Sequence, residues 1–96
     1  MTDITTLIIS AISTKKLITL RYSGSLRTVE PFLIGYDTKK NLVLSAWQTS
    51  GQTGTGWREF LVAKISELAI IDAHFAGNRP GYNRADPRIP QKLARI

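Results

Sequence analysis

The chain contains no cysteine, which excludes disulfides, thiolate zinc sites and cysteine nucleophiles. Its single histidine, His74, has no nucleophile or pair of carboxylates beside it in the sequence. The acidic residues are scattered singly among basic ones, without the spacing of metal ligands, and no serine lies in a nucleophile-elbow context. We therefore expect a protein that is not an enzyme and that needs no metal or cofactor.

Long apolar runs are missing as well. No stretch approaches the roughly 18 apolar residues that a membrane-spanning helix needs. The run from Leu7 to Ile12 is short and follows Asp3 rather than basic residues, unlike a signal peptide. Apolar residues make up 43% and charged residues 21% of the chain, which is ordinary for a globular protein. These features predict a soluble, cytoplasmic domain with no membrane partner.

Basic residues exceed acidic ones by 13 to 7, which gives a net charge of +6. The excess is concentrated late in the chain, because residues 74–96 contain five Arg or Lys and one acid, whereas residues 1–73 contain eight and six. A basic segment of this kind raises the local concentration of anions such as nucleic acid, nucleotides or an acidic protein surface. A solubilising tail with no specific partner is the alternative interpretation.

An amphipathic helix is predicted at the start of the sequence. Apolar residues recur there with helical spacing and form one face, made of Ile4, Leu7, Ile8, Ala11 and Ile12. Asp3 or Thr2 can cap this helix, and Thr14 to Lys16 end it. We expect the helix to pack on the core.

Beyond Lys16 the pattern changes to alternation with a period of two, which predicts five short strands. These strands span residues 17–22, 27–36, 42–48, 57–62 and 65–72, with turns at 23–25 and 37–41 and a mobile, glycine-containing loop, a candidate lid, at 49–56. Pro31 cannot donate to a sheet ladder and marks an edge, a bulge or a bend. A helix is the competing interpretation of 65–72, but Ile70-Ile71 and the short length favour a strand.

One helix followed by five short strands is typical of a small barrel or a strongly bent sheet. At 96 residues the chain fits one such unit. The strand pattern stops near His74, so we predict a mainly β domain over 1–73 and an extended basic C-terminal tail over 74–96. The tail is expected to wrap the sheet or to dock on a neighbouring molecule, with at most a short helical turn between Asp86 and Pro90.

The order of these elements and three of their segments resemble the WYL-domain family. The segments are LITLRYSG at 17–24, RTVEPFLIG at 27–35 and WREFLVAKISELAII at 57–71. Tyr22, Val29-Glu30-Pro31 and the run from Arg58 to Ile65 match recurrent family features, and the resemblance covers roughly residues 7–72. It implies an N-terminal helix on an Sm-like, SH3-type β-barrel, here of five strands, and a sensor module of the kind found in bacterial transcription and defence regulators.

The sequence departs from the family in two respects. The namesake Trp-Tyr-Leu triplet falls on Leu42-Val43-Leu44, so a ligand contact by these three residues is not carried over. The 96 residues also leave no room for a helix-turn-helix, so the resemblance implies a stand-alone module.

The resemblance implies that the domain binds an anionic ligand, a nucleotide or a single-stranded nucleic acid, in a groove lined by basic and aromatic residues. Basic residues contact phosphates and aromatic residues stack on bases. The candidate ligand-binding residues are Arg27, Arg58 and Lys64 at family positions that are often basic, Ser45 and Trp47 on one strand face, and Arg79, Tyr82 and Arg84, where an aromatic lies between two bases. Duller interpretations are a pairing of Arg58 with Glu30 or Glu59, and core or interface roles for Trp47 and Trp57.

Two functions follow. In the first, the chain is a non-catalytic sensor of a nucleotide or a short single-stranded nucleic acid. In the second, it is an assembly or adaptor module that binds copies of itself, or an acidic protein, through sheet edges and the tail. Because Sm-like barrels commonly associate edge to edge, we expect homo-oligomerisation to accompany the first function. The tail could then cross to a partner subunit.

Overall fold

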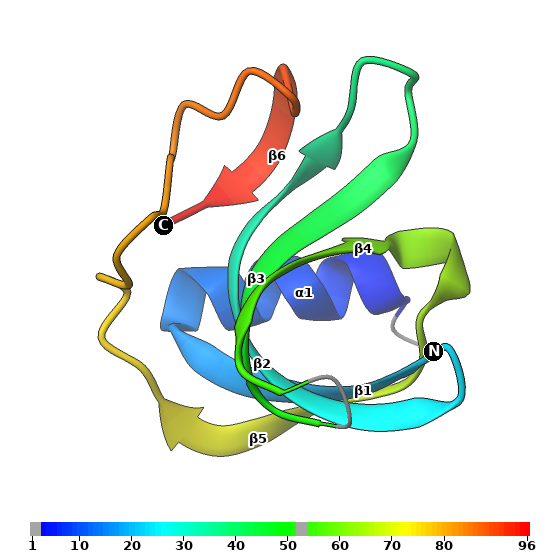
Figure 1. Cartoon of the computed structure of the whole chain (residues 1–96), viewed down its shortest axis with the longest axis vertical. Coiled ribbons are helices and arrows are strands. Elements are labelled where there is room, and N and C mark those ends of the chain that lie inside the picture. Colours follow the sequence, from blue (N-terminus) through cyan, green and yellow to red (C-terminus); the bar gives the residue numbers. More distant parts are fainter. Residues whose placement is uncertain (1–2, 52–53) are drawn as a thin grey trace.

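The computed structural model describes residues 3–51 and 54–96, and Figure 1 shows their arrangement. In chain order the elements are α1 (Ile4–Thr14), β1 (Lys16–Tyr22), β2 (Ser25–Tyr36), β3 (Leu42–Ser50), β4 (Gly56–Leu61), the 3-10 turn η1 (Val62–Lys64), β5 (Ser66–His74) and β6 (Gln91–Arg95). The strands form one antiparallel sheet in the order β4-β3-β2-β1-β5, and β6 pairs with β2. The prediction of a mainly β fold with an N-terminal helix is confirmed.

The sheet of the described chain differs from the expected five-stranded barrel. It has six strands and is not closed, since β4 and β5 stand at opposite ends of the strand order. Figure 1 shows β2 and β3 curving strongly past α1, which is the bent sheet that the strand pattern also allowed. Near the gap, the hydroxyl of Tyr22 accepts a hydrogen bond of 3.1 Å from the Leu61 amide. A side chain, not a strand ladder, therefore links β1 to β4.

The helix is built as its sequence predicts. The Asp3 side chain caps it by accepting a hydrogen bond from the Thr6 amide, while Thr2, the alternative cap, lies outside the described residues. The apolar stripe faces the sheet, and Ile8, Ala11 and Ile12 are buried. None of the helical segments in the described part of the chain is long and apolar enough to cross a membrane.

Both predicted hairpin turns are present. Ser23 and Gly24 have positive φ angles of 52° and 78°, as a two-residue hairpin turn between β1 and β2 requires. Between β2 and β3, the Asp37 carboxylate accepts hydrogen bonds from the backbone amides of Lys39 and Asn41. These bonds lower the pKa of Asp37, and the bond from the Asn41 amide has the largest effect.

Pro31 lies at a bulge inside β2, in the middle of the sheet. Its partner on β3 is Ala46, and the next pair is Leu33 with Ser45, so Phe32 is the extra residue. On the other edge of β2, the pairing with β1 ends at Val29 and the pairing with β6 begins at Leu33. Of the three roles predicted for Pro31, the bulge is the one observed.

The C-terminal segment is not the extended tail that we expected. Residues 75–90, named the strap below, cross the sheet in a series of turns, and residues 91–95 then form β6 against β2. The strand was missed because it has only five residues, three of them polar, so that alternation over so short a run gives a weak signal. The segment folds back on its own chain, which is one of the two placements expected for it.

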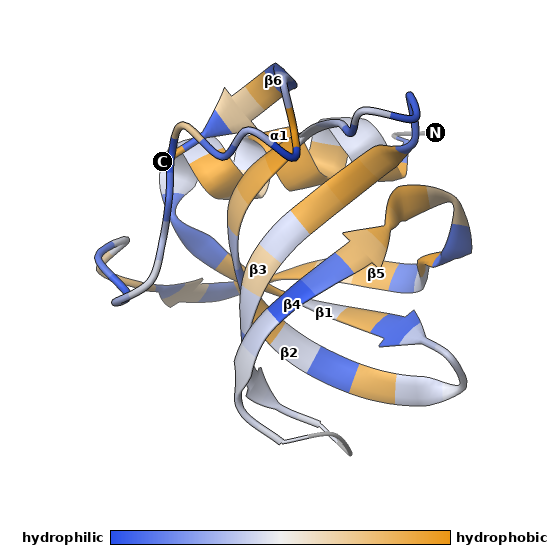
Figure 2. Cartoon of the chain, turned by 45° about the horizontal axis from the view of Figure 1, so that its top comes forward, coloured by the Kyte–Doolittle hydropathy of each residue, from blue (hydrophilic) through white to orange (hydrophobic). Residues whose placement is uncertain are grey.

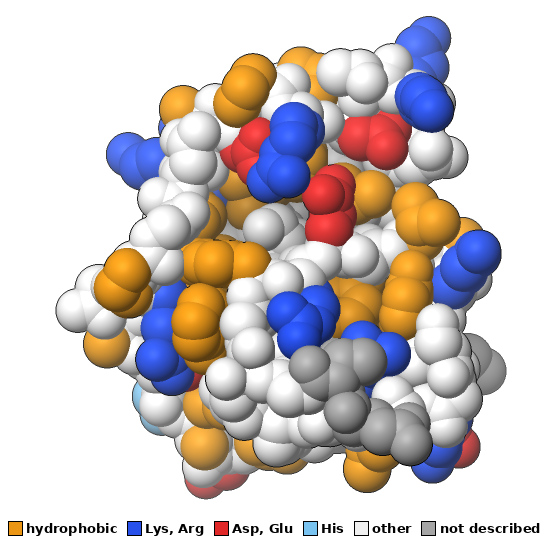
Figure 3. All heavy atoms as spheres, viewed as in Figure 1, with side chains coloured by type: hydrophobic (Ala, Val, Ile, Leu, Met, Phe, Trp, Pro, Cys, Tyr) orange, Lys and Arg blue, Asp and Glu red, His pale blue; other side chains and the backbone are white. Residues whose placement is uncertain are grey.

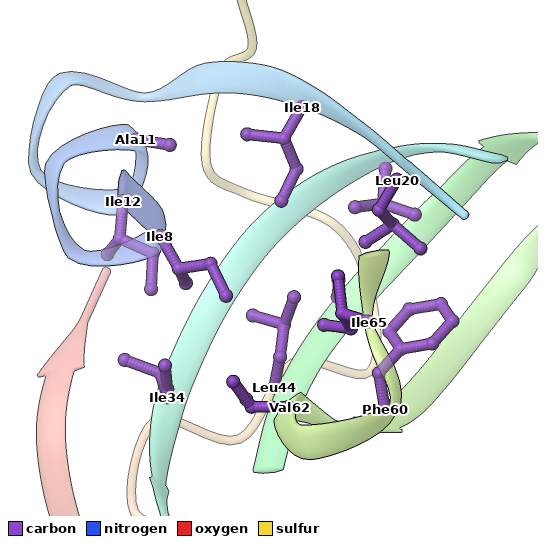
Figure 4. Packing of buried hydrophobic residues seen from close by; sticks show 12 residues of the cluster. Ile8, Ala11, Ile12, Ile18, Leu20, Ile34, Leu44, Phe60, Val62 and Ile65 are labelled. Carbon is purple, nitrogen blue, oxygen red and sulfur yellow. The ribbon is translucent and has the colours of Figure 1, made fainter. Parts of the chain in front are cut away.

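The sheet has an inner face, covered by α1, and an outer face, covered by the strap. The inner face carries the main apolar core, to which α1, β1, β2, β3, β4 and η1 all contribute side chains that point toward one another (Figure 4). Apolar residues concentrate where the strands pass α1 (Figure 2). On the outer face a smaller cluster joins Leu33, Val43 and Ile89.

Candidate functional site

Five aromatic rings gather on the outer face and form the aromatic cluster. They are Phe32 of β2, Trp47 of β3, Trp57 of β4, and Phe75 and Tyr82 of the strap. Phe32 lies at the centre, with its ring centroid 5.0 Å from Trp57, 5.2 Å from Phe75 and 4.9 Å from Tyr82. Such edge and tilted contacts suit the quadrupoles of aromatic rings.

Strand register explains this clustering. Trp47 pairs with Trp57 across β3 and β4, and with Glu30 across β3 and β2, so these three side chains share the outer face. The bulge turns Phe32 and Leu33 to the same side. Residues from three strands thus form one surface.

The strap is attached to this surface mainly through Arg79. Its guanidinium group makes a two-pronged contact with the carboxylate of Glu30, at 2.9 and 3.1 Å, and lies 4.9 Å over the ring of Trp47. The hydrogen bonds to Glu30 raise the pKa of Arg79. The Glu30 side chain is only 9% exposed, so Arg79 neutralises a nearly buried charge. Glu30 is thus a structural hydrogen-bond acceptor, as its position before Pro31 suggested.

Trp57 and Tyr82 make further contacts that hold the strap. The indole nitrogen of Trp57 donates a hydrogen bond of 2.9 Å to the carbonyl of Pro80. The ring of Tyr82 stacks on Trp57, with 5.9 Å between the centroids, and its hydroxyl donates to the carbonyl of Ile96 at 3.2 Å. Burial raises the pKa of Tyr82. Both aromatics are half-buried.

A pocket of about 210 Å³, named the Trp57–Tyr82 pocket, opens beside these rings. Its lining combines aromatic, basic, acidic and neutral polar residues: Ser45, Trp57, Arg58, Glu59, Gly81, Tyr82, Asn83, Asp86 and Arg88. Figure 3 shows a face of the molecule on which acidic and basic side chains lie beside apolar ones. The pocket offers both hydrogen-bond donors and acceptors.

Arg88 connects the two acidic groups of the pocket. It donates to the Asp86 carboxylate at 2.7 and 3.0 Å and lies 3.9 Å from Glu59. The hydrogen bond from Arg88 lowers the pKa of Asp86, and the same contact raises the pKa of Arg88. Asp86 is buried and Arg88 exposed, so the pair closes one wall of the pocket.

Arg27 points to the opposite, inner face, where it is 8% exposed. Its guanidinium donates to Ser25 Oγ, Gln48 Oε1 and the Tyr22 carbonyl, and lies over the rings of Tyr22 and Phe60. These contacts give the charge only neutral partners in the described chain. Arg27 therefore closes the end of the core that lies away from α1.

The structure brings together five of the eight candidate ligand residues. Ser45, Arg58 and Tyr82 line the pocket, and Trp47 and Arg79 lie beside it in the aromatic cluster. The other three are apart: Arg27 lies on the inner face, and Lys64 and Arg84 are exposed. The 49–56 loop, a candidate lid, lies partly outside the described residues, at 52 and 53.

Sequence analysis missed several pocket residues, among them Glu59, Asn83, Asp86 and Arg88. Glu59 reaches the pocket because β4 pairs with β3 opposite Ser45, and the other three because the strap turns back over the outer face. The strap residues have no local periodic signal. Arg79 contacts Glu30 and Arg88 contacts Glu59, while the Arg58 guanidinium donates to the carbonyls of Trp57 and Gly54, at 2.9 and 3.4 Å.

Within the described residues, no three His, Cys, Asp or Glu side chains come together as a metal site would require. Comparisons of the chain with protein-family models, curated proteins and solved structures gave no match.

Proposed function

We propose that this chain is a non-catalytic sensor that binds an anionic ligand, either a nucleotide or a short single-stranded nucleic acid. The supporting observation is the Trp57–Tyr82 pocket, where two aromatic and two arginine residues line one cavity. The resemblance to the WYL-domain family points to the same ligand class. The helix-covered bent sheet fits the Sm-like, SH3-type barrel that this resemblance implies, which we propose as its fold relationship.

The pocket suits one nucleobase. Its volume of about 210 Å³ lies below the roughly 300–1,000 Å³ of pockets for drug-sized ligands. A base presents donors and acceptors along its edge. The pocket matches both, with Arg58 as a donor, Glu59 as an acceptor and Asn83 as either. An aromatic wall adds a stacking surface.

Excess positive charge close to Tyr82 would hold the phosphates, since the charges of Arg84 and Arg95 both act on this side chain. All seven carboxylates belong to the described chain and already have local partners: Asp3, Glu30, Asp37, Glu59, Glu67, Asp72 and Asp86. Arg84 and Arg95 adjoin each other, since a guanidinium nitrogen of Arg95 donates to the Arg84 carbonyl at 3.0 Å. Two neighbouring cations of this kind attract phosphate groups.

The test is binding of labelled single-stranded DNA, RNA and nucleotides at two salt concentrations. Wild type is compared with Arg58→Ala and with the control Lys39→Ala. Lys39 is an exposed residue of the β2–β3 turn, and its replacement removes one positive charge, as Arg58→Ala does. We expect affinity that falls steeply with salt and is reduced about tenfold by Arg58→Ala but little by Lys39→Ala. Equal losses in the two variants, or no binding by any probe, would refute the proposed site.

Assembly through strand edges is the second candidate function. Each of β4, β5 and β6 pairs with a single neighbour in the described sheet and so presents one open edge. Leu93 on β6 is also 42% exposed. Self-association of this type would persist in high salt, so the oligomer mass at two ionic strengths separates it from nucleic-acid binding.

A further inference from the structure

The contacts between the strap and the outer face have the form of peptide recognition. Three strap residues within four positions contact two surface residues: Arg79 pairs with Glu30, the Pro80 carbonyl accepts from the Trp57 indole, and Tyr82 stacks on Trp57. Arg79 fits Glu30 as a planar fork fits a carboxylate, which a lysine cannot reproduce. The outer face is therefore expected to discriminate between peptide side chains, such as arginine and lysine opposite Glu30.

The surface half of this contact belongs to strands. Glu30, Trp47 and Trp57 lie on β2, β3 and β4 at paired positions of the ladder, and Phe32 lies at the bulge of β2. Grooves lined by aromatic side chains recur in the recognition of proline-containing peptides. The groove is therefore organised by the sheet, independently of the segment that fills it.

Apart from the Phe75 amide, which donates to the Lys15 carbonyl at 2.9 Å, the strap is held on the outer face by contacts that involve side chains. In the described chain, the backbone hydrogen bonds among residues 76–90 are those of its own turns, such as Tyr82 to Arg79 and Asp86 to Asn83. Gly77, with a φ angle of 80°, can absorb a change of direction near the start of this stretch. A second hollow of about 200 Å³ remains between Glu30 and residues 74–80. The strap can thus be exchanged without breaking a ladder.

We propose that the outer face is a peptide-binding surface for an Arg-Pro-x-Tyr segment of another polypeptide, and that the strap occupies it in cis. The partner is a basic peptide with an aromatic residue two positions after the proline. The arginine pairs with Glu30, the proline carbonyl accepts from the Trp57 indole, and the aromatic ring stacks on Trp57. This interaction does not depend on the proposed nucleotide binding, but it uses Trp57 and displaces Tyr82, both of which line the Trp57–Tyr82 pocket, so we expect the two to exclude each other.

The experiment uses a synthetic peptide of residues 75–84 and the full-length chain. Trp47 and Trp57 are the only tryptophans in the sequence and both contact the groove, so their fluorescence reports binding. In wild type the tethered strap competes at an effective concentration of about a millimolar, so added peptide binds weakly. In Arg79→Ala the competition falls and the Glu30 carboxylate lacks its partner. We expect the peptide to bind this variant about tenfold more tightly and to raise its melting temperature.

Two control peptides define specificity. One carries Arg79→Lys and keeps the charge without the fork, and the other has the same composition in scrambled order. Both should bind about tenfold more weakly than the native peptide. Equal binding of all three peptides, or equal binding to wild type and Arg79→Ala, would overturn the proposal.

The design also covers a variant that does not fold alone. In that case the native peptide, but not the scrambled one, should restore the far-ultraviolet circular dichroism of wild type, and failure to do so would count against the proposal. A wild-type dimer that the native peptide dissociates would support the same surface, with the strap of a second copy as its occupant. If the chain proves not to bind nucleotides, the results expected for the peptides stay the same.

Discussion

Replacement of Gly35 by alanine tests whether β6 lies on β2. Gly35 pairs with Lys92 of β6. A Cβ atom at this position would overlap the carbonyl oxygen of Gln91 and lie 2.8 Å from Cγ2 of Ile89 and 2.9 Å from the Cα of Lys92. Two of these atoms belong to the backbone and cannot turn away. Alanine is therefore accommodated only if β6 shifts or leaves the sheet.

The cost follows from two contributions. Overpacking of a tight contact costs about 1–3 kcal/mol. Displacement of β6 also exposes part of Ile89, which is fully buried in the outer cluster, and full burial of such a side chain contributes about 1.5–3 kcal/mol. We expect Gly35→Ala to lower the free energy of unfolding by about 3 kcal/mol. At about 4–8 °C per kcal/mol, the melting temperature falls by about 12–24 °C.

The assays are thermal unfolding and amide hydrogen exchange of β6. Gly24→Ala is the matched control, because a Cβ there meets open space and only the φ angle of 78° is unfavourable, at about 1–2 kcal/mol. We expect the Ala94 amide, on the strand paired with β2, to exchange faster in Gly35→Ala only. A destabilisation no larger than that of Gly24→Ala, with unchanged exchange in β6, would refute this docking of the C-terminal strand.

Two further predictions concern stability. Phe60 is 1% exposed and packs its ring edge-on against Tyr22, 4.9 Å away, so Phe60→Ala should lower the free energy of unfolding in urea by about 3–5 kcal/mol, and Phe60→Leu by less. The lowered pKa of Asp86 contributes stability that is complete above its ordinary carboxyl pKa and is lost as pH falls through the lowered value. Melting temperatures from pH 6 to 2 should therefore drop less in Arg88→Gln than in wild type, and parallel profiles would contradict this linkage.

Local patterns predicted the elements that bury one continuous face. The helical stripe of Ile8, Ala11 and Ile12 and the Asp3 cap are set within one segment, so the sequence indicates both. Alternation in residues 42–48 likewise separated the inner Leu44 and Ala46 from the outer Trp47. Such signals depend on neighbours a few positions apart. The structure therefore confirms the predictions that rest on them.

The outer-face site depends on contacts between distant segments. Arg79 lies 49 positions from Glu30, and Trp57 lies 23 positions from Pro80. Arg79 and Tyr82 attracted attention as a basic and aromatic pattern, but their partners are set by strand register and by the path of the strap. Neither the strand register nor the path of the strap produces a periodic pattern in the local sequence. The place of β6 in the sheet could not be predicted for the same reason, since β6 pairs with a strand more than fifty positions earlier in the chain.

The bulge at Pro31 connects the sheet topology to the outer-face site. Pro31 lacks the backbone N–H that a continuous ladder needs, and the edge of β2 divides there between β1 and β6. The Phe32 carbonyl left in the gap accepts a hydrogen bond of 2.9 Å from the Ile96 amide. The same bulge turns Phe32 toward Trp57, beside Glu30. One interruption of the ladder thus provides both the docking edge for the end of the chain and the groove in which the strap lies.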